Sequence, residues 1–400
     1  MVRVISKSEC AALVFATIFF SAYGLPRLQK SNSVVLPRPA NSDGLGALQV
    51  SVLPNRPLIE KGHDQQTVNF DLLVRNTGPD TYRLVCIRLQ LYDRHAKLEV
   101  ERELNENGKP PALDSIRQRV VKPGDAIDIY QPFYSFSSEV EIDRMHFELL
   151  FMKEGHSASP VAISADEAVL ADARPEAYNP DPFCLPLHGL VLVHDGHDFN
   201  SHHRRFNLVE RFRADPTSAV SANLYAYDFM RTTAAGALFR GDPFQKENWL
   251  TYGAAIFAPA SGFVAESVAD IPENTFDLQG AVEIPSSAES MDPQGFGNYV
   301  TILHGDGRVS WLLHMQPGSV AVKKGDRVRA GQFLGRVGFS GDSLFPHLHY
   351  NVTRGAMYPS QGVPSYFKNF DWVLGSRTLG IPAGQVDTGD LIESEQQKCR

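Results

Sequence analysis

Short runs of alternating apolar and polar residues recur along the chain and predict a mainly β protein. Between residues 46 and 166 they include TVNFDLLVRN, RLVCIRLQLYD and RMHFELLFM, each of strand length. Turn sequences such as Asn76-Thr77-Gly78-Pro79 separate these runs. Several short strands in a segment of this length favour an N-terminal immunoglobulin-like β-sandwich domain over residues 46–166. Its sequence has no nucleophile motif, metal-ligand cluster or glycine-rich loop, so we expect a spacer or binding module.

The second half of the chain also alternates in strand-length runs, now punctuated by glycine. GNYVTILHGDGRVSWLLHM and HLHYNV are examples, and helix signals are weak throughout. Residues 167–186 are rich in proline, alanine and acidic side chains, which predicts a linker. A strand-rich second domain is then expected over 187–370. Residues 371–400 lack strong periodicity and predict a loop-like C-terminal tail.

The first 24 residues differ from the rest and predict an export signal. Arg3 and Lys7 precede the uncharged run Ala11–Gly24, which is short for a bilayer span and typical of a signal-peptide core. Small residues at its end favour cleavage before Leu25. We therefore expect a signal peptide over 1–24 and a periplasmic or extracellular protein, with an uncleaved anchor as the alternative. No further apolar run of spanning length follows, so the mature chain is not expected to insert into a membrane.

Charge and cysteine content narrow the classes of function. The formal net charge is −8, and the sequence has no basic field, so no nucleic-acid partner is expected. Removal of the signal peptide leaves Cys86, Cys184 and Cys399, an odd number, so at least one thiol is unpaired within the chain. A disulfide framework is not indicated. No two of these cysteines are close in sequence, which argues against cysteine metal ligands.

The segment DSLFPHLHYNVTRG, residues 342–355, carries two histidines on one face of a predicted strand. With a side-chain period of two, His347, His349 and Asn351 share one face, and apolar residues occupy the other. Such a pair is most often solvated or hydrogen-bonded, and a metal site is the alternative. A hydrolytic zinc site needs three protein ligands and one open position, so further ligands must come from elsewhere in the chain.

Upstream segments supply the remaining candidates. Asp228 is a lone carboxylate in the apolar strand NLYAYDFMR, and if buried it must be paired with a cation such as arginine, hydrogen-bonded or metal-bound. His202 and His203 are adjacent, and on an extended chain they point opposite ways, so at most one of them is expected to be a ligand. His314 closes an apolar strand on the same face as Leu312. Next to a metal it would carry protons or donate to a developing oxyanion.

Four sequence blocks follow one another in the second half: FAPASGFVAE, GNYVTILHGDGRVSWLLHM, VKKGDRVRAGQFLGRVGFSG and PHLHYNV. Together they resemble the lysostaphin/LytM-type zinc metallopeptidases, which include the β-lytic endopeptidases. The resemblance covers about residues 187–352 and is strongest from Tyr252 onward. It implies an antiparallel β metallopeptidase domain, a duplicated hybrid motif, with its site in an open groove. The third block also resembles lipoyl and biotinyl carrier hairpins, but no lysine occurs between Lys324 and Lys368, which excludes a carrier.

The resemblance implies a role for each matching position. Its His-x-His motif matches His347 and His349, of which the second binds zinc and the first takes part in catalysis. Its strand histidine matches His314, also catalytic, and its metal-binding aspartate matches Asp228. The remaining zinc ligand is a histidine upstream of that aspartate, matched here by His203. This sequence departs from the commonest family arrangement, because 25 positions separate His203 from Asp228 instead of a few.

The long separation leaves more than one candidate for the first ligand. We interpret residues 204–223 as an insertion on the rim of the groove and residues 271–296 as a second wall. We prefer His203 as the first ligand, with His202 as the next candidate. His194 and His197 are less favoured alternatives.

The implied function is a secreted zinc metalloendopeptidase, with Zn²⁺ as cofactor and the peptide cross-links of bacterial peptidoglycan as substrate. One alternative is a catalytically inactive module of the same fold that binds cell wall or regulates another hydrolase. Its signature would be loss of a ligand or catalytic histidine, and this sequence retains Asp228, His314, His347 and His349. A second alternative is a cell-envelope binding protein that acts through its N-terminal sandwich.

Overall fold

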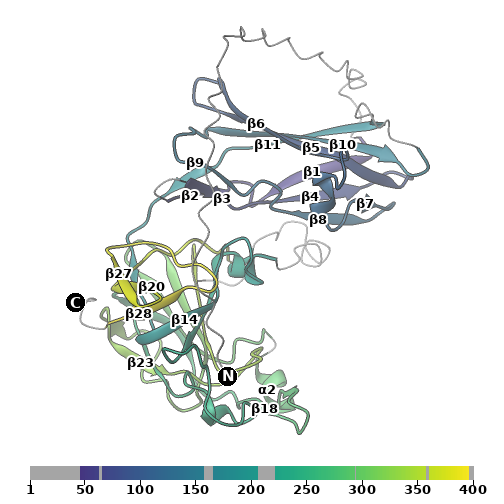
Figure 1. The fold of residues 1–400 in the computed structure, drawn as a ribbon. Coiled ribbons are helices and arrows are strands. Elements are labelled where there is room, and N and C mark those ends of the chain that lie inside the picture. The colour runs from purple at the N-terminus through teal and green to yellow at the C-terminus, as the bar shows by residue number, and fades with distance from the viewer. Residues whose placement is uncertain are drawn as a thin grey trace, which may run out of the picture. The chain divides into compact units, whose positions relative to one another are not determined.

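The computed structural model describes residues 46–62, 65–156, 165–205, 221–292, 294–356 and 360–395. These residues are mainly β, which confirms the predicted fold class (Figure 1). Among them no helix has both the length and the apolar character that crossing a bilayer requires. The predicted signal peptide lies outside the described residues. The helical elements are short: η1 (Ala112–Ser115), η2 (His203–Arg205), η3 (Ala222–Tyr225), η4 (Lys246–Asn248) and α2 (Ser286–Met291).

The strands of the first half form three sheets. Buried residues from all three sheets share one apolar core, so the sheets pack against one another. The immunoglobulin-like topology stays a prediction. The first sheet holds β1 (Leu48–Leu53), β4 (Asp71–Asn76) and β8 (Ala126–Tyr130). The second sheet holds β11 (Glu167–Ala173), β10 (Arg144–Lys153), β5 (Tyr82–Tyr92) and β6 (Leu98–Asn105), and β7 (Val120–Val121) pairs with β5. The third sheet holds β12 (Glu176–Tyr178), β2 (Leu58–Lys61), β3 (Gln65–Val68) and β9 (Ser135–Ser137).

Ten strands of the second half pair in one antiparallel sheet, in agreement with the predicted antiparallel architecture. In spatial order they are β22 (Arg327–Val328), β17 (Gly262–Val268), β20 (Asn298–His304), β21 (Val309–Met315), β24 (Leu348–Thr353), β15 (Tyr227–Arg231), β14 (Gly189–Asp195), β28 (Leu391–Ser394), β26 (Phe370–Leu374) and β27 (Arg377–Ile381). Three short pairs accompany it: β13 (Phe183–Cys184) with β25 (Phe367–Lys368), β16 (Ala255–Phe257) with β23 (Phe333–Arg336), and β18 (Thr275–Phe276) with β19 (Val282–Glu283).

The two faces of this sheet differ in chemistry. On β24, Leu348, Tyr350 and Val352 enter the apolar core together with residues of the neighbouring strands. His347 and His349 lie on the opposite face, as the side-chain period of two predicts. The sheet therefore has one face that supplies hydrophobic stabilisation and one that is available for polar chemistry.

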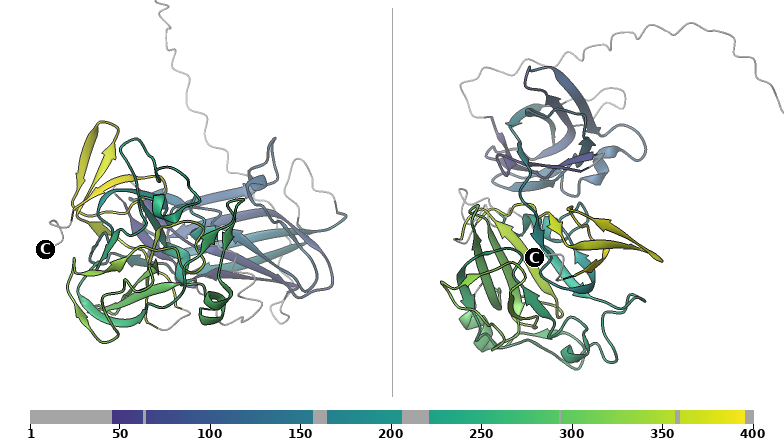
Figure 2. Two further views of the ribbon diagram at one scale, coloured as in Figure 1. Left: turned by 90° about the horizontal axis from the view of Figure 1, so that it is seen from below. Right: turned by 90° about the vertical axis from the view of Figure 1, so that its left-hand side faces the viewer.

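Two sequence-based predictions about irregular segments were wrong. The expected linker, 167–186, contains β11, β12 and β13, and the expected tail, 371–400, contributes to β26, β27 and β28. The β26–β27 hairpin, drawn in yellow, extends away from the rest of the large sheet (Figure 2). Its outer strand is mostly exposed on both faces, so apolar residues do not alternate there and the sequence carries no periodic signal.

The prediction of at least one unpaired cysteine and no disulfide framework holds only in part. Cys86 is a free, buried thiol, as expected for at least one cysteine. Cys184 is disulfide-bonded, although the sequence indicated no disulfide framework. Cys399 lies outside the described residues.

Arg204, in η2, is buried in contact with residues of the first half. Its side chain has no exposed surface, and its Nη2 donates to Oε1 of Gln131. The same nitrogen lies 3.8 Å from Oδ1 of Asp71, and the guanidinium carbon lies 5.2 Å from the ring centroid of Tyr130. A buried arginine thus anchors the turn that contains His203.

Candidate functional site

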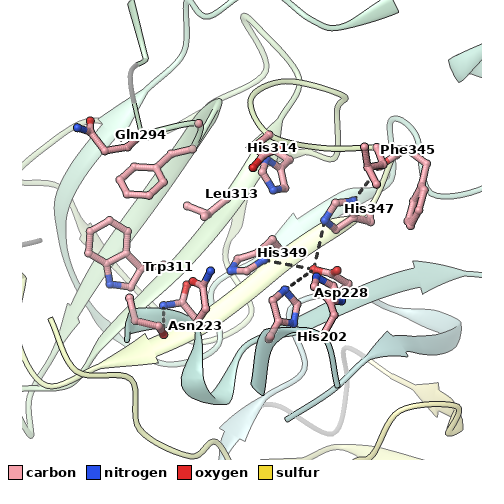
Figure 3. A pocket seen from close by; sticks show the side chains of 17 residues that line it. His202, Asn223, Asp228, Gln294, Trp311, Leu313, His314, Phe345, His347 and His349 are labelled. Atoms are coloured by element: carbon pink, nitrogen blue, oxygen red, sulfur yellow. Dashed lines mark hydrogen bonds and ion pairs between the residues drawn. The ribbon is translucent and has the colours of Figure 1, made fainter. Parts of the chain in front are cut away.

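The polar face of the large sheet forms the floor of a pocket of about 220 Å³ (Figure 3). Strands β15, β21 and β24 supply the floor, and loops supply the walls. The described residues that line it are His202, His203, Ala222, Asn223, Asp228, Gln294, Gly295, Phe296, Trp311, Leu313, His314, Asp342, Leu344, Phe345, His347, His349 and Asn351. All five residues that the sequence singled out as metal-binding or catalytic are among them.

Strand register brings Asp228 and His349 together. They are direct partners in the antiparallel pair β15–β24, and His349 is in turn the partner of Leu313 on β21. Directly opposite residues in such a pair have neighbouring side chains. Accordingly, Nδ1 of His349 lies 3.2 Å from Oδ1 of Asp228, although the two residues are far apart in the sequence.

Three histidines surround the Asp228 carboxylate. Its Oδ1 lies 3.2 Å from Nδ1 of His349, 3.2 Å from Nε2 of His347 and 3.5 Å from Nε2 of His203. Burial alone would raise the pKa of Asp228, but the nearby charges of His347 and His203 hold it well below its usual range. The carboxyl is therefore ionised and available as a ligand.

The donor set fits a divalent cation such as zinc. Candidate ligand atoms of His203, Asp228 and His349 lie within 4.8 Å of one another. Oδ1 of Asp228 and Nε2 of His349 are buried without a hydrogen-bond partner, which is costly unless another group satisfies them. Two imidazoles and one carboxylate are a ligand set that hydrolytic zinc sites use, with the fourth position open.

A β-bulge turns His314 toward the pocket. Asn298 on β20 pairs with Met315 on β21, and Val300 pairs with Leu312, so β21 has one residue more than β20 in this interval. His314 lies in this interval and has a φ of +61°. The sequence placed His314 on the face of Leu312, which is wrong: Leu312 enters the apolar core, whereas His314 lines the pocket. A bulge inserts a residue and so resets the alternation of side chains beyond it.

His314 and His347 are held in matching ways. Nδ1 of His314 donates to the carbonyl of Ser340 at 2.8 Å, and Nδ1 of His347 donates to the carbonyl of Phe345 at 2.8 Å. Because a carbonyl only accepts, both rings carry a proton on Nδ1, and each Nε2 is left for other partners. Burial, followed by the charges of the neighbouring histidines, holds the pKa of His314 well below its usual range.

His203, the preferred first ligand, is buried, whereas His202 is mostly exposed. The two rings do not point opposite ways as an extended chain would require. Their centroids are 4.1 Å apart, because a 3₁₀ turn begins at His203. Neither of the less favoured candidates belongs to the described group of candidate ligands that contains Asp228. His197 pairs with Glu60 at 2.9 Å, and His194 is exposed beside the ring of Phe345.

Sequence reasoning missed the residues that complete the site. Asp195 lies 2.6 Å from Nδ1 of His203, and the signal for it was the one used for Asp228, a lone carboxylate at an apolar strand. Trp311 on the floor strand β21 and Phe345 in a wall loop add aromatic surface to the pocket, and both look like ordinary core positions in the sequence. The expected second wall is present, because Gln294 and Phe296 line the pocket. Of the expected rim insertion, residues 206–220 lie outside the described residues.

An antiparallel β-sheet that presents a buried carboxylate and several histidines in one pocket defines a class of candidate metal-dependent hydrolases. Comparison with known families agrees with this class, because residues 250–360 match Peptidase family M23. The chain therefore carries a peptidase family M23 domain, and the resemblance to lysostaphin/LytM-type peptidases is confirmed. The matched residues include His314, His347 and His349, whereas His203 and Asp228 precede them.

Curated relatives match over short segments. The peptidoglycan DD-endopeptidase ShyC of Vibrio cholerae is 44% identical over 98 residues, which is 24% of this chain and 19% of that protein. The glycyl-glycine endopeptidase ALE-1 of Staphylococcus capitis is 42% identical over 57 residues, 14% of this chain and 15% of that protein. The chain thus matches less than a fifth of the length of either relative.

Among solved structures, the catalytic domain of the antimicrobial peptidase lysostaphin from Staphylococcus simulans is 24% identical. The match covers 32% of this chain and 86% of that chain, with a TM-score of 0.19. The M23 metalloprotease pseudoalterin is 13% identical, over 55% of this chain and 94% of that chain, with a TM-score of 0.26.

Proposed function

We propose that this protein is an exported zinc endopeptidase that cleaves peptide bonds in peptidoglycan cross-links. The observation that carries the proposal is the Asp228 carboxylate, buried among three histidines in a pocket to which the residues matched to family M23 contribute His347 and His349. His203, Asp228 and His349 would hold the zinc ion. When bound, zinc supplies a Lewis acid that polarises the scissile carbonyl and acidifies a water molecule.

His314 and His347 would move the protons of the reaction. Each ring is oriented by a main-chain carbonyl on Nδ1, which leaves Nε2 as the atom that exchanges a proton with water or with the departing amine. The two rings are separated by 4.9 Å between centroids, so both can reach the same reacting group. A protonated Nε2 also stabilises negative charge on a tetrahedral oxygen.

The pocket lining supports cleavage within a peptide chain. Neither lysine nor arginine occurs among the described residues that line it. A free terminal carboxylate of a substrate would therefore meet no lysine or arginine side chain among these residues, whereas an internal peptide bond needs none. The activities for which the relatives are named, DD-endopeptidase and glycyl-glycine endopeptidase, support a bacterial cell-wall peptide as substrate and differ in the bond that is cut.

The test is zinc content and muropeptide release from purified peptidoglycan, measured for the unchanged chain, for His349→Ala and for His314→Ala. We expect about one zinc per chain, as a three-ligand site requires, and zinc-dependent release of cleaved cross-links. His349→Ala should lose both zinc and activity. Zinc-free protein after incubation with zinc, or full zinc occupancy in His349→Ala, would contradict the assignment. Bound zinc without cleavage of any peptide cross-link would favour the inactive, regulatory alternative.

A further inference from the structure

A second buried carboxylate, Asp195, lies directly beside the candidate metal ligands. It is the last residue of β14 and only 5% exposed. A register shift after Val193 makes Asp195 the direct partner of Asp228 on the neighbouring strand β15. Two like charges placed opposite each other on adjacent strands destabilise a sheet, and burial increases that cost. A group that compensates both charges is therefore required between them.

His203 is that group. Its Nδ1 lies 2.6 Å from Oδ2 of Asp195, and its Nε2 lies 3.5 Å from Oδ1 of Asp228. One imidazole thus spans the two carboxylates, with one ring nitrogen assigned to each. When the ring donates its Nδ1 proton to Asp195, Nε2 is the nitrogen with a lone pair, and it faces the candidate metal centre.

Asp195 also fixes the main chain that carries this histidine. Its carboxylate accepts a hydrogen bond from Oγ of Ser201 at 2.7 Å, and from the backbone N–H groups of His202 at 3.0 Å and His203 at 3.3 Å. These bonds hold the short connection between β14 and η2. Ring tautomer, ring orientation and backbone position of His203 all depend on one side chain.

The same bonds make Asp195 a weaker candidate than Asp228 for direct metal binding, although Asp195, His202 and His203 also place ligand atoms within 4.8 Å of one another. A carboxylate offers about four lone-pair positions. Hydrogen bonds from Oγ of Ser201 and from the backbone N–H groups of His202 and His203 already occupy the carboxylate, and Nδ1 of the exposed His202 ring lies 3.0 Å away. Little acceptor capacity is left for a cation, in contrast to Oδ1 of Asp228.

We propose that Asp195 is the positioning residue of the metal centre: it holds His203 as the Nδ1–H tautomer with Nε2 directed at the metal. The inference rests on the proposed function, because it presupposes that His203 binds zinc. Carboxylates that accept from the second nitrogen of a ligating histidine raise its basicity and fix its orientation, and their loss typically weakens metal binding by about 10–100-fold.

The experiment compares the full-length chain with Asp195→Asn and Asp198→Asn. Asp198 is a matched control, because it is buried in the same connection and accepts two backbone N–H groups, from Asn200 and Thr388. The zinc dissociation constant is measured by competition with a chromogenic chelator, and the visible spectrum is recorded after substitution with Co²⁺. Urea unfolding of chelator-treated protein separates loss of folding from loss of affinity.

Asp195→Asn is expected to weaken zinc binding by about 10–100-fold and to change the Co²⁺ spectrum, while Asp198→Asn matches the unchanged chain in both. If Asp195→Asn and Asp198→Asn have the same zinc affinity and the same Co²⁺ spectrum, the proposal for Asp195 is overturned, but the proposed function is not. Failure of the unchanged chain to bind zinc overturns the proposed function as well. If Asp195→Asn does not fold, Asp195→Glu, which keeps the charge, is measured instead. It should bind zinc more weakly than the unchanged chain, and equal affinity counts against the proposal.

Discussion

The imidazole rings of His314 and His347 lie with centroids 4.9 Å apart, although one comes from a β-bulge on β21 and the other from the residue before β24. Each ring is anchored through Nδ1 to a main-chain carbonyl, at Ser340 for His314 and at Phe345 for His347. The paired arrangement gives two preorganised imidazoles, of which His347 lies beside Asp228.

The role of His314 predicts a separation of metal binding from activity. His314→Ala should lower the cleavage rate by about 10²–10⁴-fold, the range typical of a general acid or base. Zinc occupancy should stay unchanged, because the Asp228 carboxylate contacts other histidines and not His314. Cleavage rate and zinc content measured on the same preparation decide the matter. Loss of zinc in His314→Ala would show that His314 is a metal ligand and would contradict its assignment as a proton carrier.

The burial of Arg204 predicts a large stability effect. Arg204→Ala should lower the free energy of unfolding by about 3–5 kcal/mol, because it leaves the Asp71 carboxylate buried without its cationic neighbour. The control is Arg56→Ala, whose pair with Glu176 is exposed, and which should change stability by about 0.5 kcal/mol or less. Urea unfolding curves of the two variants provide the comparison. Similar midpoints would show that the Arg204 contact contributes little.

The stacking of His188 on Phe257 predicts a pH dependence of stability. Burial lowers the pKa of His188 from 6.5 to about 4 in the folded chain. Between these two values the unfolded chain takes up a proton that the folded chain does not, so the free energy of unfolding falls as the pH decreases. His188→Phe keeps the ring stack and removes this contribution. Its unfolding free energy should decline less steeply from pH 6.5 to 4 than that of the unchanged chain; parallel declines would contradict the prediction.

The environment of Cys86 predicts an unreactive thiol. Burial, followed by the charge of Glu103, raises its pKa to about 12, so almost no thiolate exists at pH 8. Iodoacetamide should leave Cys86 unmodified in the folded protein and modify it fully in urea. Peptide mass mapping distinguishes Cys86 from the other cysteines. Rapid modification without urea would mean that β5 opens far more readily than its burial suggests.

The sequence predicts those site residues whose placement follows from regular alternation. His347 and His349 share a strand face because the period of two is undisturbed there. The mainly β fold was recognised for the same reason. Asp228 stood out because an isolated carboxylate in an apolar strand needs a partner.

The rest of the site depends on local irregularities that alternation does not encode. The orientation of His314 depends on a bulge, and the proximity of His202 to His203 depends on a 3₁₀ turn. Asp195 reaches Asp228 only through a register shift in β14. Such features arise from long-range pairing and loop geometry, so a window of neighbouring residues contains no signal for them.

The row of cross-strand partners Asp195, Asp228, His349 and Leu313 has a consequence for how the protein can diverge. The distances among these side chains are set by main-chain pairing inside a sheet, and the pocket walls come from loops that the pairing does not constrain. In the proposed peptidase, lengthening or replacing a wall loop would therefore alter which peptide fits without moving Asp228 and His349. Chemistry and selectivity reside in separable parts of the chain, and new specificities can arise by loop exchange on an unchanged floor.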